Sequence, residues 1–304
     1  MDKMHLPPIV PKSREGFALI VTLSVLSVVI ALTVVLLSYF KEVKSDSDTT
    51  KALIQANVYY ADILAQFNKF TKKKSLFSQL YRFPVALRSP DGRFSMVLRC
   101  KPLATGVNIN WLAMERAVNK RHLFAEAQRL FDLLVQEYDL EEPDRLLEMI
   151  RIEIAIGRKF VNPEQSRLIQ KNGIISYQQF YGILSRYELE VDDPKVGRIP
   201  WRKYFSFSLT SEKIDAEYSA AELISFLFDI DLKTVREWKG MVPQSSLESF
   251  VNDNAGNYNE KKNLLAGNTF LGETHCAVDF GTGYNFTFDY IQGEAKYFEF
   301  YGKH

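Results

Sequence analysis

Two acidic runs supply the side chains that could ligate a metal ion. Carboxylate oxygens are common ligands of Ca²⁺. The calcium candidates in these runs are Asp139, Glu141, Glu142, Asp144, Asp192 and Asp193. Neither run has the spacing of a calcium loop, and acidic residues also stabilise the first turn of a helix. The pattern therefore favours solvated helix starts, and calcium is the only cofactor that the sequence suggests.

The four histidines do not fall in the spacing of a zinc site or a catalytic dyad. They are His5, His122, His275 and His304. One Cys beside one His is too few for zinc, and His275 and Cys276 would point to opposite faces of a strand. The chain also lacks a phosphate-binding glycine loop and a Gly-x-Ser-x-Gly elbow. We therefore expect a protein that is not an enzyme.

An unbroken apolar run from Phe17 to Phe40 predicts a transmembrane helix. The run has no charged residue, and its helical length of about 36 Å exceeds a hydrocarbon core of about 30 Å. Three basic residues precede it: Lys3, Lys12 and Arg14. The positive-inside rule therefore places the N-terminus in the cytoplasm and residues 41–304 across the membrane. A cleaved secretory signal is the weaker interpretation, because no small-residue cleavage pattern closes the run.

Cys100 and Cys276 lie in segments that we expect to be strands of one sheet. On the far side of the membrane the compartment is oxidising, so these two residues could form a disulfide. Closing a loop of about 176 residues would stabilise the fold by roughly 5 kcal/mol at most. Two unpaired thiols on different strands are an equally open alternative.

The apolar helix is expected to continue beyond the membrane. After a polar stretch at 41–51, apolar residues recur every three or four positions from Leu53 to Phe70, which is typical of an amphipathic helix. Lys72, Lys73 and Lys74 suit a helix C-terminus, where cations meet partial negative charge. We predict one helix over 17–74, with a transmembrane half at 17–40 and an amphipathic half at 41–74.

Strand patterns occur on both sides of a helical stretch. Period-two patterns predict strands at 83–88, 93–103, 275–280, 284–290 and 296–301. Helical periodicity predicts helices at 124–134, 143–154, 176–188, 219–229, 231–239 and 244–252. Ser219 and Glu222 have the spacing of a capping box. The sequence thus predicts an α+β fold in which a helical domain, 104–252, interrupts a small antiparallel sheet domain formed by 75–103 and 253–304.

The junction Gly16–Phe17 resembles the type IV prepilin signal, in which a short basic leader ends in Gly before Phe and an apolar helix. This resemblance implies that a prepilin peptidase removes residues 1–16 and methylates the new N-terminus at Phe17. Gly suits such a site because it brings no side chain into a protease cleft. A signal anchor that retains its leader is the alternative.

Val21 would be the fifth residue of the processed chain, where most pilin-like proteins carry Glu. A charge in the bilayer costs about 3 kcal/mol or more, and in the family it is offset by the amino terminus of the adjacent subunit. A subunit with no neighbour ahead of it gains nothing from that charge. In lacking this Glu, the chain resembles the K-type minor pseudopilin of type II secretion, which is placed at the tip of the pseudopilus.

Two further regions are similar to the K-type family. Residues 106–110, followed by 128–134, resemble its Asn-containing strand and next helix, and 214–224 resembles an Ile-Asn-Val-Asn segment with Asp215 and Glu217 replacing Asn. The resemblance implies a pilin-like ladle, a long helix packed on a small sheet, with a large inserted helical domain in which the family binds calcium. It also implies a single-pass protein of the bacterial inner membrane with most of its chain in the periplasm.

The partners implied by the resemblance are other minor pseudopilins, the inner-membrane assembly platform and prepilin peptidase. A formal net charge of +1 argues against a general nucleic-acid surface. Two alternatives remain open. One is a minor pilin of a type IV pilus, and the other is a membrane-anchored receptor ectodomain.

Overall fold

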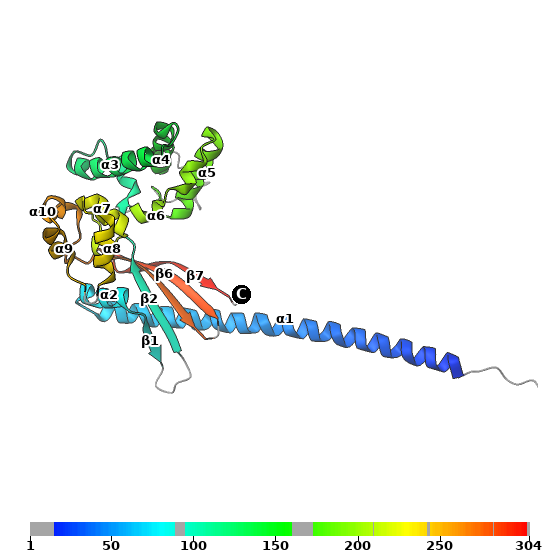
Figure 1. Ribbon diagram of the computed structural model, residues 1–304. Helices are drawn as coiled ribbons and strands as arrows, with labels where there is room; N and C mark the ends of the chain where they lie inside the picture. Colours follow the sequence, from blue (N-terminus) through cyan, green and yellow to red (C-terminus); the bar gives the residue numbers. More distant parts are fainter. Residues whose placement is uncertain are drawn as a thin grey trace, which may run out of the picture. The chain divides into compact units, whose positions relative to one another are not determined.

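The computed structural model describes residues 15–88, 95–159, 173–208, 210–241, 244–281 and 283–302. The chain divides into two compact units, residues up to Ala61 with 302–304, and Asp62–Tyr301. A long N-terminal helix and an antiparallel sheet make up an α+β fold, so the predicted fold class is confirmed at this level (Figure 1).

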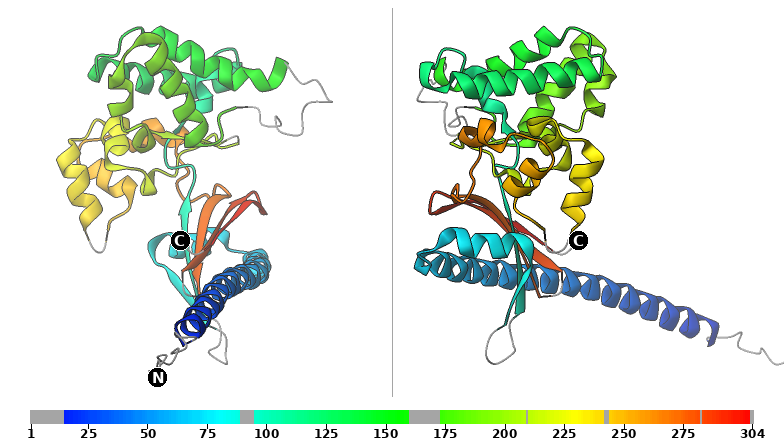
Figure 2. Two further views of the ribbon diagram at one scale, coloured as in Figure 1. Left: turned by 90° about the vertical axis from the view of Figure 1, so that its right-hand side faces the viewer. Right: turned by 60° about the vertical axis from the view of Figure 1, so that its left-hand side comes forward.

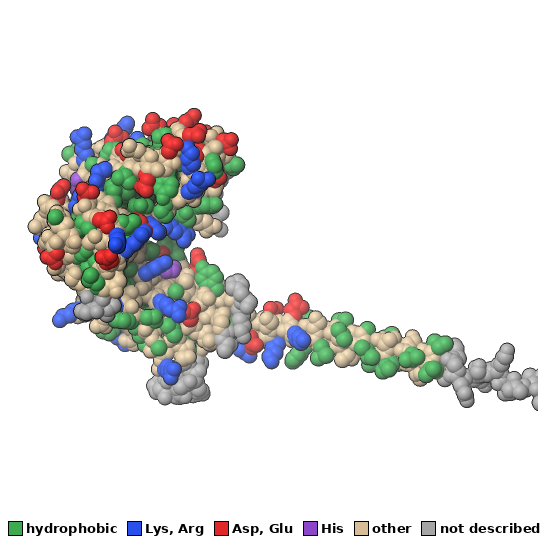
Figure 3. Space-filling model, in the orientation of Figure 1, with side chains coloured by type: hydrophobic (Ala, Val, Ile, Leu, Met, Phe, Trp, Pro, Cys, Tyr) green, Lys and Arg blue, Asp and Glu red, His purple; other side chains and the backbone are tan. Residues whose placement is uncertain are grey.

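Helix α1 (Glu15–Lys69) begins the chain's described part and contains the whole apolar run. Its large apolar side chains from Leu19 to Phe40 are exposed, and Figure 3 shows hydrophobic side chains along this part of the helix. Because the residues between are almost all strong helix formers or β-branched apolar residues without Gly or Pro, nothing interrupts the helical backbone. The last turns of α1, from Asp62, belong to the second unit.

The end of α1 differs from the sequence prediction. The helix ends at Lys69, and a separate helix α2 (Lys73–Arg82) follows, so the prediction of one helix to residue 74 is wrong there. The Lys73 ammonium donates a hydrogen bond to the carbonyl of Phe67 in the last turn of α1. The cation therefore meets the helix C-terminus as expected, but from the next helix. The break lets Phe77 of α2 stack on Tyr290 of the sheet.

The main sheet has five antiparallel strands in the order β1-β2-β5-β6-β7. Their bounds are β1 Val85–Arg88, β2 Ser95–Pro102, β5 Glu273–Phe280, β6 Tyr284–Ile291 and β7 Glu294–Tyr301. The strand predictions are thus confirmed. Alternate residues of β5 and β6 are buried, and Phe67 of α1 packs its ring on Phe288 and Tyr290 of that buried face.

Helical segments occupy the chain between β2 and β5. Their bounds are η1 Ile109–Ala113, η2 Val118–Lys120, α3 Arg121–Glu137, α4 Pro143–Lys159, α5 Tyr177–Val191, η3 Pro194–Arg198, α6 Trp201–Tyr204, η4 Ala216–Tyr218, α7 Ala221–Phe228, α8 Leu232–Gly240, α9 Leu247–Asp253, α10 Tyr258–Lys261 and η5 Lys262–Leu264. Figures 1 and 2 show these helices gathered at one end of the sheet. Helices continue past residue 252, through α10 and η5, before β5 begins.

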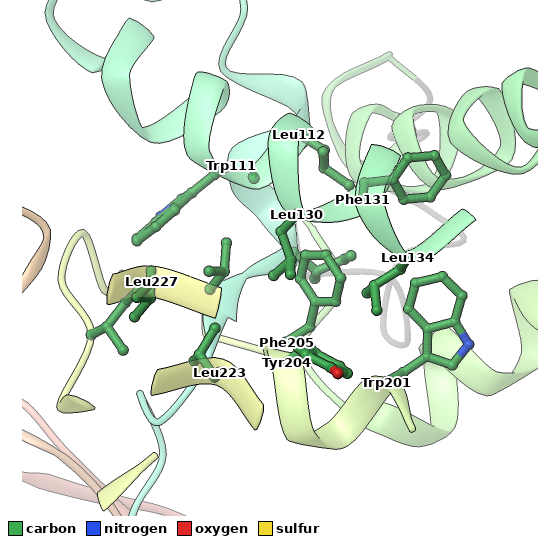
Figure 4. Packing of buried hydrophobic residues seen from close by; sticks show 14 of the residues in the cluster. Trp111, Leu112, Leu130, Phe131, Leu134, Trp201, Tyr204, Phe205, Leu223 and Leu227 are labelled. Carbon is green, nitrogen blue, oxygen red and sulfur yellow. The ribbon is translucent and has the colours of Figure 1, made fainter. Parts of the chain in front are cut away.

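These helices share one hydrophobic core that runs from Val107 to Leu265 in sequence. Figure 4 shows its centre, where Trp201 of α6 lies near Phe131 and Leu134 of α3. The Trp201 ring lies 6.4 Å from the Phe131 ring, and its indole N–H donates to the carbonyl of Val196 at 3.0 Å. The large aromatic side chain is therefore buried with its polar atom satisfied.

A close backbone approach holds two short strands inside this core. Strand β3 (Val107–Asn108) pairs in parallel with β4 (Phe205–Ser206). A Cβ on Gly106 would lie 2.5 Å from the carbonyl carbon of Phe205, so only Gly fits at this position. The glycine thus allows the chain leaving β2 to contact a strand about 100 residues later.

The predicted capping box at the start of α7 is not formed. The N-cap residue is Ala220, and the Ser219 hydroxyl has no hydrogen-bond partner among the described residues. Glu222 instead accepts hydrogen bonds from Lys203 at 2.8 Å and Arg236 at 3.0 Å. Burial alone would raise the pKa of Glu222, but Lys203, the backbone N–H of Glu222 and Arg236 together lower that pKa to about 2. The tertiary ion pairs therefore displace the local cap.

Candidate membrane anchor and polar sites

Within the described chain, α1 is the one helix long and apolar enough to cross a membrane. Its most apolar window has a mean hydropathy of 2.9, and none of it is buried. A core helix of a soluble protein would bury such residues, whereas this helix leaves them exposed. The helix could therefore be a membrane anchor, and a signal sequence would have the same properties.

The hydroxyl groups within the apolar part of α1 are compatible with lipid. Thr22 donates to the carbonyl of Leu19 at 2.9 Å, and Thr33 donates to the carbonyl of Val29 at 2.8 Å. Ser27 makes the same kind of bond one turn back. Because these polar hydrogens are satisfied within the helix, burial in hydrocarbon would leave no donor of these three side chains without an acceptor.

The predicted processing site lies at the start of α1. Gly16 and Phe17 have helical backbone, since α1 begins at Glu15, and the leader before it lies outside the described residues. Val21 lies one turn further along, with 44% of its surface exposed. Cleavage after Gly16 and methylation of Phe17 stay predictions.

The two acidic runs lie next to each other, although they are distant in sequence. A carboxylate oxygen of Asp193 accepts the backbone N–H of Glu141 at 2.8 Å. Lys195 lies between the runs, where its ammonium donates to the Asp139 carbonyl at 2.7 Å and to the Asp139 carboxylate at 3.2 Å. The same ammonium lies 3.9 Å from the Glu141 carboxylate. The lysine therefore pairs with two carboxylates of the first run, Asp139 and Glu141.

The remaining acidic candidates have structural positions. Asp144 lies in the first turn of α4, Glu142 directly precedes that helix with φ of 46°, and Asp192 is the left-handed C-cap of α5. In the described ranges, no three His, Cys, Asp or Glu side chains are placed to hold a metal ion. Calcium binding at these residues stays a prediction. Lys195 follows the second run by two residues in the sequence. This proximity was the signal that could have revealed a lysine beside the acidic runs.

Cys100 and Cys276 are directly opposite each other on β2 and β5 and are joined by a disulfide. Their Cα atoms lie 4.1 Å apart, and both side chains are buried. The bond closes a loop of 176 residues that includes all the helices after α2. It therefore ties together the two parts of the sheet that flank the helical segments.

Two buried asparagines connect three segments of the helical core. The Asn108 amide donates to the carbonyls of Ser208 at 2.7 Å and Ser211 at 3.1 Å. The Asn110 side chain donates to the carbonyl of Ile174 at 2.8 Å and accepts its N–H at 2.7 Å. In the sequence, the segment that contains Asn108 and Asn110 was singled out only by its resemblance to the K-type family. The contacts indicate a structural role, because these amides satisfy backbone groups that would otherwise be buried without partners.

A buried polar cluster lies where α2 meets η4 and was not predicted. Lys74 and Asp215 form an ion pair at 3.7 Å, and burial raises the pKa of Asp215 to about 6. In the described part of the chain, the buried side-chain polar atoms without a hydrogen-bond partner are Lys74 Nζ, Tyr218 OH and Ser219 Oγ. A cleft of about 400 Å³ opens beside Asp215. No local pattern could reveal a pair so distant in sequence.

An apolar groove of about 690 Å³ lies on the second unit. It is formed by the last turns of α1 together with α2, β1 and β2.

Comparisons of the chain with protein-family models, curated proteins and solved structures find no match. The function is therefore inferred from the chain's own features.

Proposed function

We propose that this chain is a K-type minor pseudopilin at the tip of a type II secretion pseudopilus, where it assists protein export across the outer membrane. The observation that carries the proposal is the Gly16–Phe17 junction at the start of an exposed apolar helix. A prepilin peptidase would cut this bond, and the helix would hold the subunit in the bacterial inner membrane until assembly. Its leader would be cytoplasmic and its second unit periplasmic.

The fold supports the proposal in one respect. The end of α1 packs on an antiparallel sheet, as the handle of a pilin-like ladle would, through the contacts of Phe67 with Phe288 and Tyr290. The helices between β2 and β5 are then interpreted as a domain inserted into that sheet. A periplasmic location is also compatible with the Cys100–Cys276 disulfide, because disulfides persist in oxidising compartments.

The tip position follows from two features within this proposal. Val21 provides no carboxylate for the amino terminus of a subunit ahead of it. The helical segments add a large body to the sheet, which would clash with a subunit stacked above. Other minor pseudopilins and the inner-membrane assembly platform are the expected partners.

The N-terminus of the membrane-extracted protein tests the proposal directly. The full chain is coexpressed with an active or an inactivated prepilin peptidase, and the N-terminal peptide is identified by mass spectrometry. We expect N-methylated Phe17 with the active peptidase and an uncut leader with the inactive one. A Gly16→Asp variant should remain uncut, whereas Ala18→Val, which changes a residue beside the junction, should be processed normally.

Two results would redirect the proposal. A chain that keeps its leader under all conditions would contradict the pseudopilin and favour an anchored receptor ectodomain. Processing at Phe17 followed by incorporation into a type IV pilus, with no effect of deletion on secretion, would favour a minor pilin instead.

A further inference from the structure

The two edges of the five-stranded sheet are protected to different degrees. At the β7 edge, one extra residue interrupts the register with β6 between Thr287 and Asp289, and Tyr297 has a φ of 57°. Glu294 and Lys296 add charged side chains along this edge. Bulges and charges are features that prevent another strand from pairing with a sheet edge.

Strand β1 forms the other edge and lacks this protection. Its register with β2 is regular, from Val85 opposite Leu98 to Arg88 opposite Ser95. Arg88 is its only charged residue, at the very end of the strand. Among the described residues, no backbone hydrogen bond connects 85–88 to any segment other than β2. The outward N–H and C=O groups of β1 are therefore available to an additional strand.

The apolar groove lies on the helix-covered side of this same edge. Its base includes the buried side chains of Ile63, Phe67 and Leu80. Its exposed apolar residues are Phe70, with 49% of its surface accessible, and Leu87 of β1, with 38%. A strand added beyond β1 would direct every second side chain toward this side, because side chains alternate along a strand. The groove is thus placed to receive those side chains.

One charge lies in the lining of the groove. Among the described residues of the lining, Asp62 is the only ionisable one, and no ion pair with it is found in that part of the chain. An occupant with a cationic side chain on its groove face would complement this carboxylate. The lining therefore favours an apolar segment that carries Lys or Arg over one that carries Asp or Glu.

We propose that β1 is a docking site for an extended segment of another polypeptide. The segment pairs with β1 as an additional strand, places alternate apolar side chains in the groove, and presents a Lys or Arg to Asp62. Main-chain hydrogen bonds provide affinity, and the groove and the carboxylate provide specificity. This inference goes beyond the proposed secretion role, because none of its residues belongs to the prepilin-like signal.

A defined peptide tests the docking site on the full chain in detergent micelles. The probe is the acetylated and amidated peptide Lys-Thr-Val-Thr-Val-Thr-Val-Thr, which places Lys and three Val side chains on one face. A fluorescent version gives the dissociation constant by anisotropy, and hydrogen exchange with mass spectrometry locates the amides that become protected. We expect saturable binding with new protection at 85–88 and no new protection on β7.

Substitutions then separate the contributions of the groove and the charge. Leu87→Lys should weaken binding about tenfold or more, because it places a charge at the groove and repels the peptide lysine. Val118→Lys adds the same charge at an apolar position that is 89% exposed and does not line the groove, so binding should be unchanged. If Leu87→Lys does not fold, Phe70→Ser provides the same test at another exposed lining residue.

The role of Asp62 has its own control. Asp62→Asn should weaken binding of the Lys peptide about threefold but leave the affinity of a matched peptide with Gln in place of Lys unchanged. Protection of β7 instead of β1, or equal binding to wild type and Leu87→Lys, would overturn the proposal. Concentration-dependent self-association that protects 85–88 and excludes the peptide would assign the edge to a second copy and would also overturn it.

Discussion

The apolar part of α1 and the core of the helical segments contain similar side chains in opposite environments. Leu36 and Val35 of α1 are more than half exposed, whereas Leu112 and Val107 of the core are fully buried. Burial from water stabilises a fold by about 25 cal/mol per Å² of apolar surface, and an exposed helix gains none of this. The apolar character of α1 is therefore compatible with a membrane anchor, whereas that of the core is explained by packing.

The largest expected effect is on the core side of this comparison. Trp201→Ala should lower the free energy of unfolding by about 3–5 kcal/mol, because it leaves a cavity beside Phe131 and Phe180. Leu36→Ala in α1 should change it by less than about 0.5 kcal/mol. Urea unfolding in detergent, followed by tryptophan fluorescence, measures both. Equal losses for the two variants would contradict the distinction.

The disulfide should provide the next largest effect. Cys276→Ser should lower the free energy of unfolding by about 2–5 kcal/mol, because the unfolded chain is no longer constrained by a closed loop of 176 residues. Wild-type protein in reducing agent should lose a similar amount, whereas the Cys276→Ser variant should not respond to it. Labelling of both cysteines in the non-reduced wild-type protein would show that the bond is absent.

The anchor side of the comparison is tested by charge. Val29→Lys should reduce membrane insertion by about 2.5–3.5 kcal/mol, because a central ammonium must be desolvated. Its effect on urea unfolding should be small, since Val29 is exposed. The membrane-bound fraction after carbonate extraction measures insertion, with Val118→Lys as the matched charge control. An insertion free energy that Val29→Lys leaves unchanged would mean that this helix is not the anchor.

The smallest expected effect concerns the pH dependence of the second unit. Burial raises the folded pKa of Asp215 to about 6 from its ordinary 3.8, so the folded state binds a proton more tightly than the unfolded state. The free energy of unfolding should therefore fall as pH rises from about 4 to about 6, by about 1–3 kcal/mol. In Asp215→Asn this contribution should disappear. Parallel pH titrations of stability that show identical slopes would contradict the assignment.

Local patterns were sufficient for much of the fold. Periodicity predicted α5, α8 and the strands β5 and β6 to within a few residues, because each has a regular buried face. Strand β7 was also found, although none of its residues is buried. The same reasoning failed at α2, because Lys73 and Lys74 suit the end of a helix but lie in the first turn of α2. Placing the break between α1 and α2 requires the aromatic contact of Phe77 with Tyr290 of the sheet. The two residues are too distant in sequence for a local pattern to reveal this contact.

The candidate sites depended even more on distant contacts. The capping box at Ser219 was displaced by Lys203 and Arg236, and the first acidic run pairs with Lys195. Each of these cations reaches its partner through the tertiary fold. The groove likewise requires the alignment of Asp62 with β1, since the two lie on different elements. Residue type therefore indicated which side chains could cap a helix or bind a metal. Tertiary packing determined whether other side chains already pair with them.

The disulfide also defines how mechanical load would pass through the molecule. Tension applied between the end of α1 and the end of β7 can cross from β2 to β5 through the bond between Cys100 and Cys276. The residues between these cysteines then form a slack covalent loop that carries none of the force. An anchored protein pulled from both ends would extend only its short flanking segments, while the helical segments would remain unloaded as long as the bond is intact.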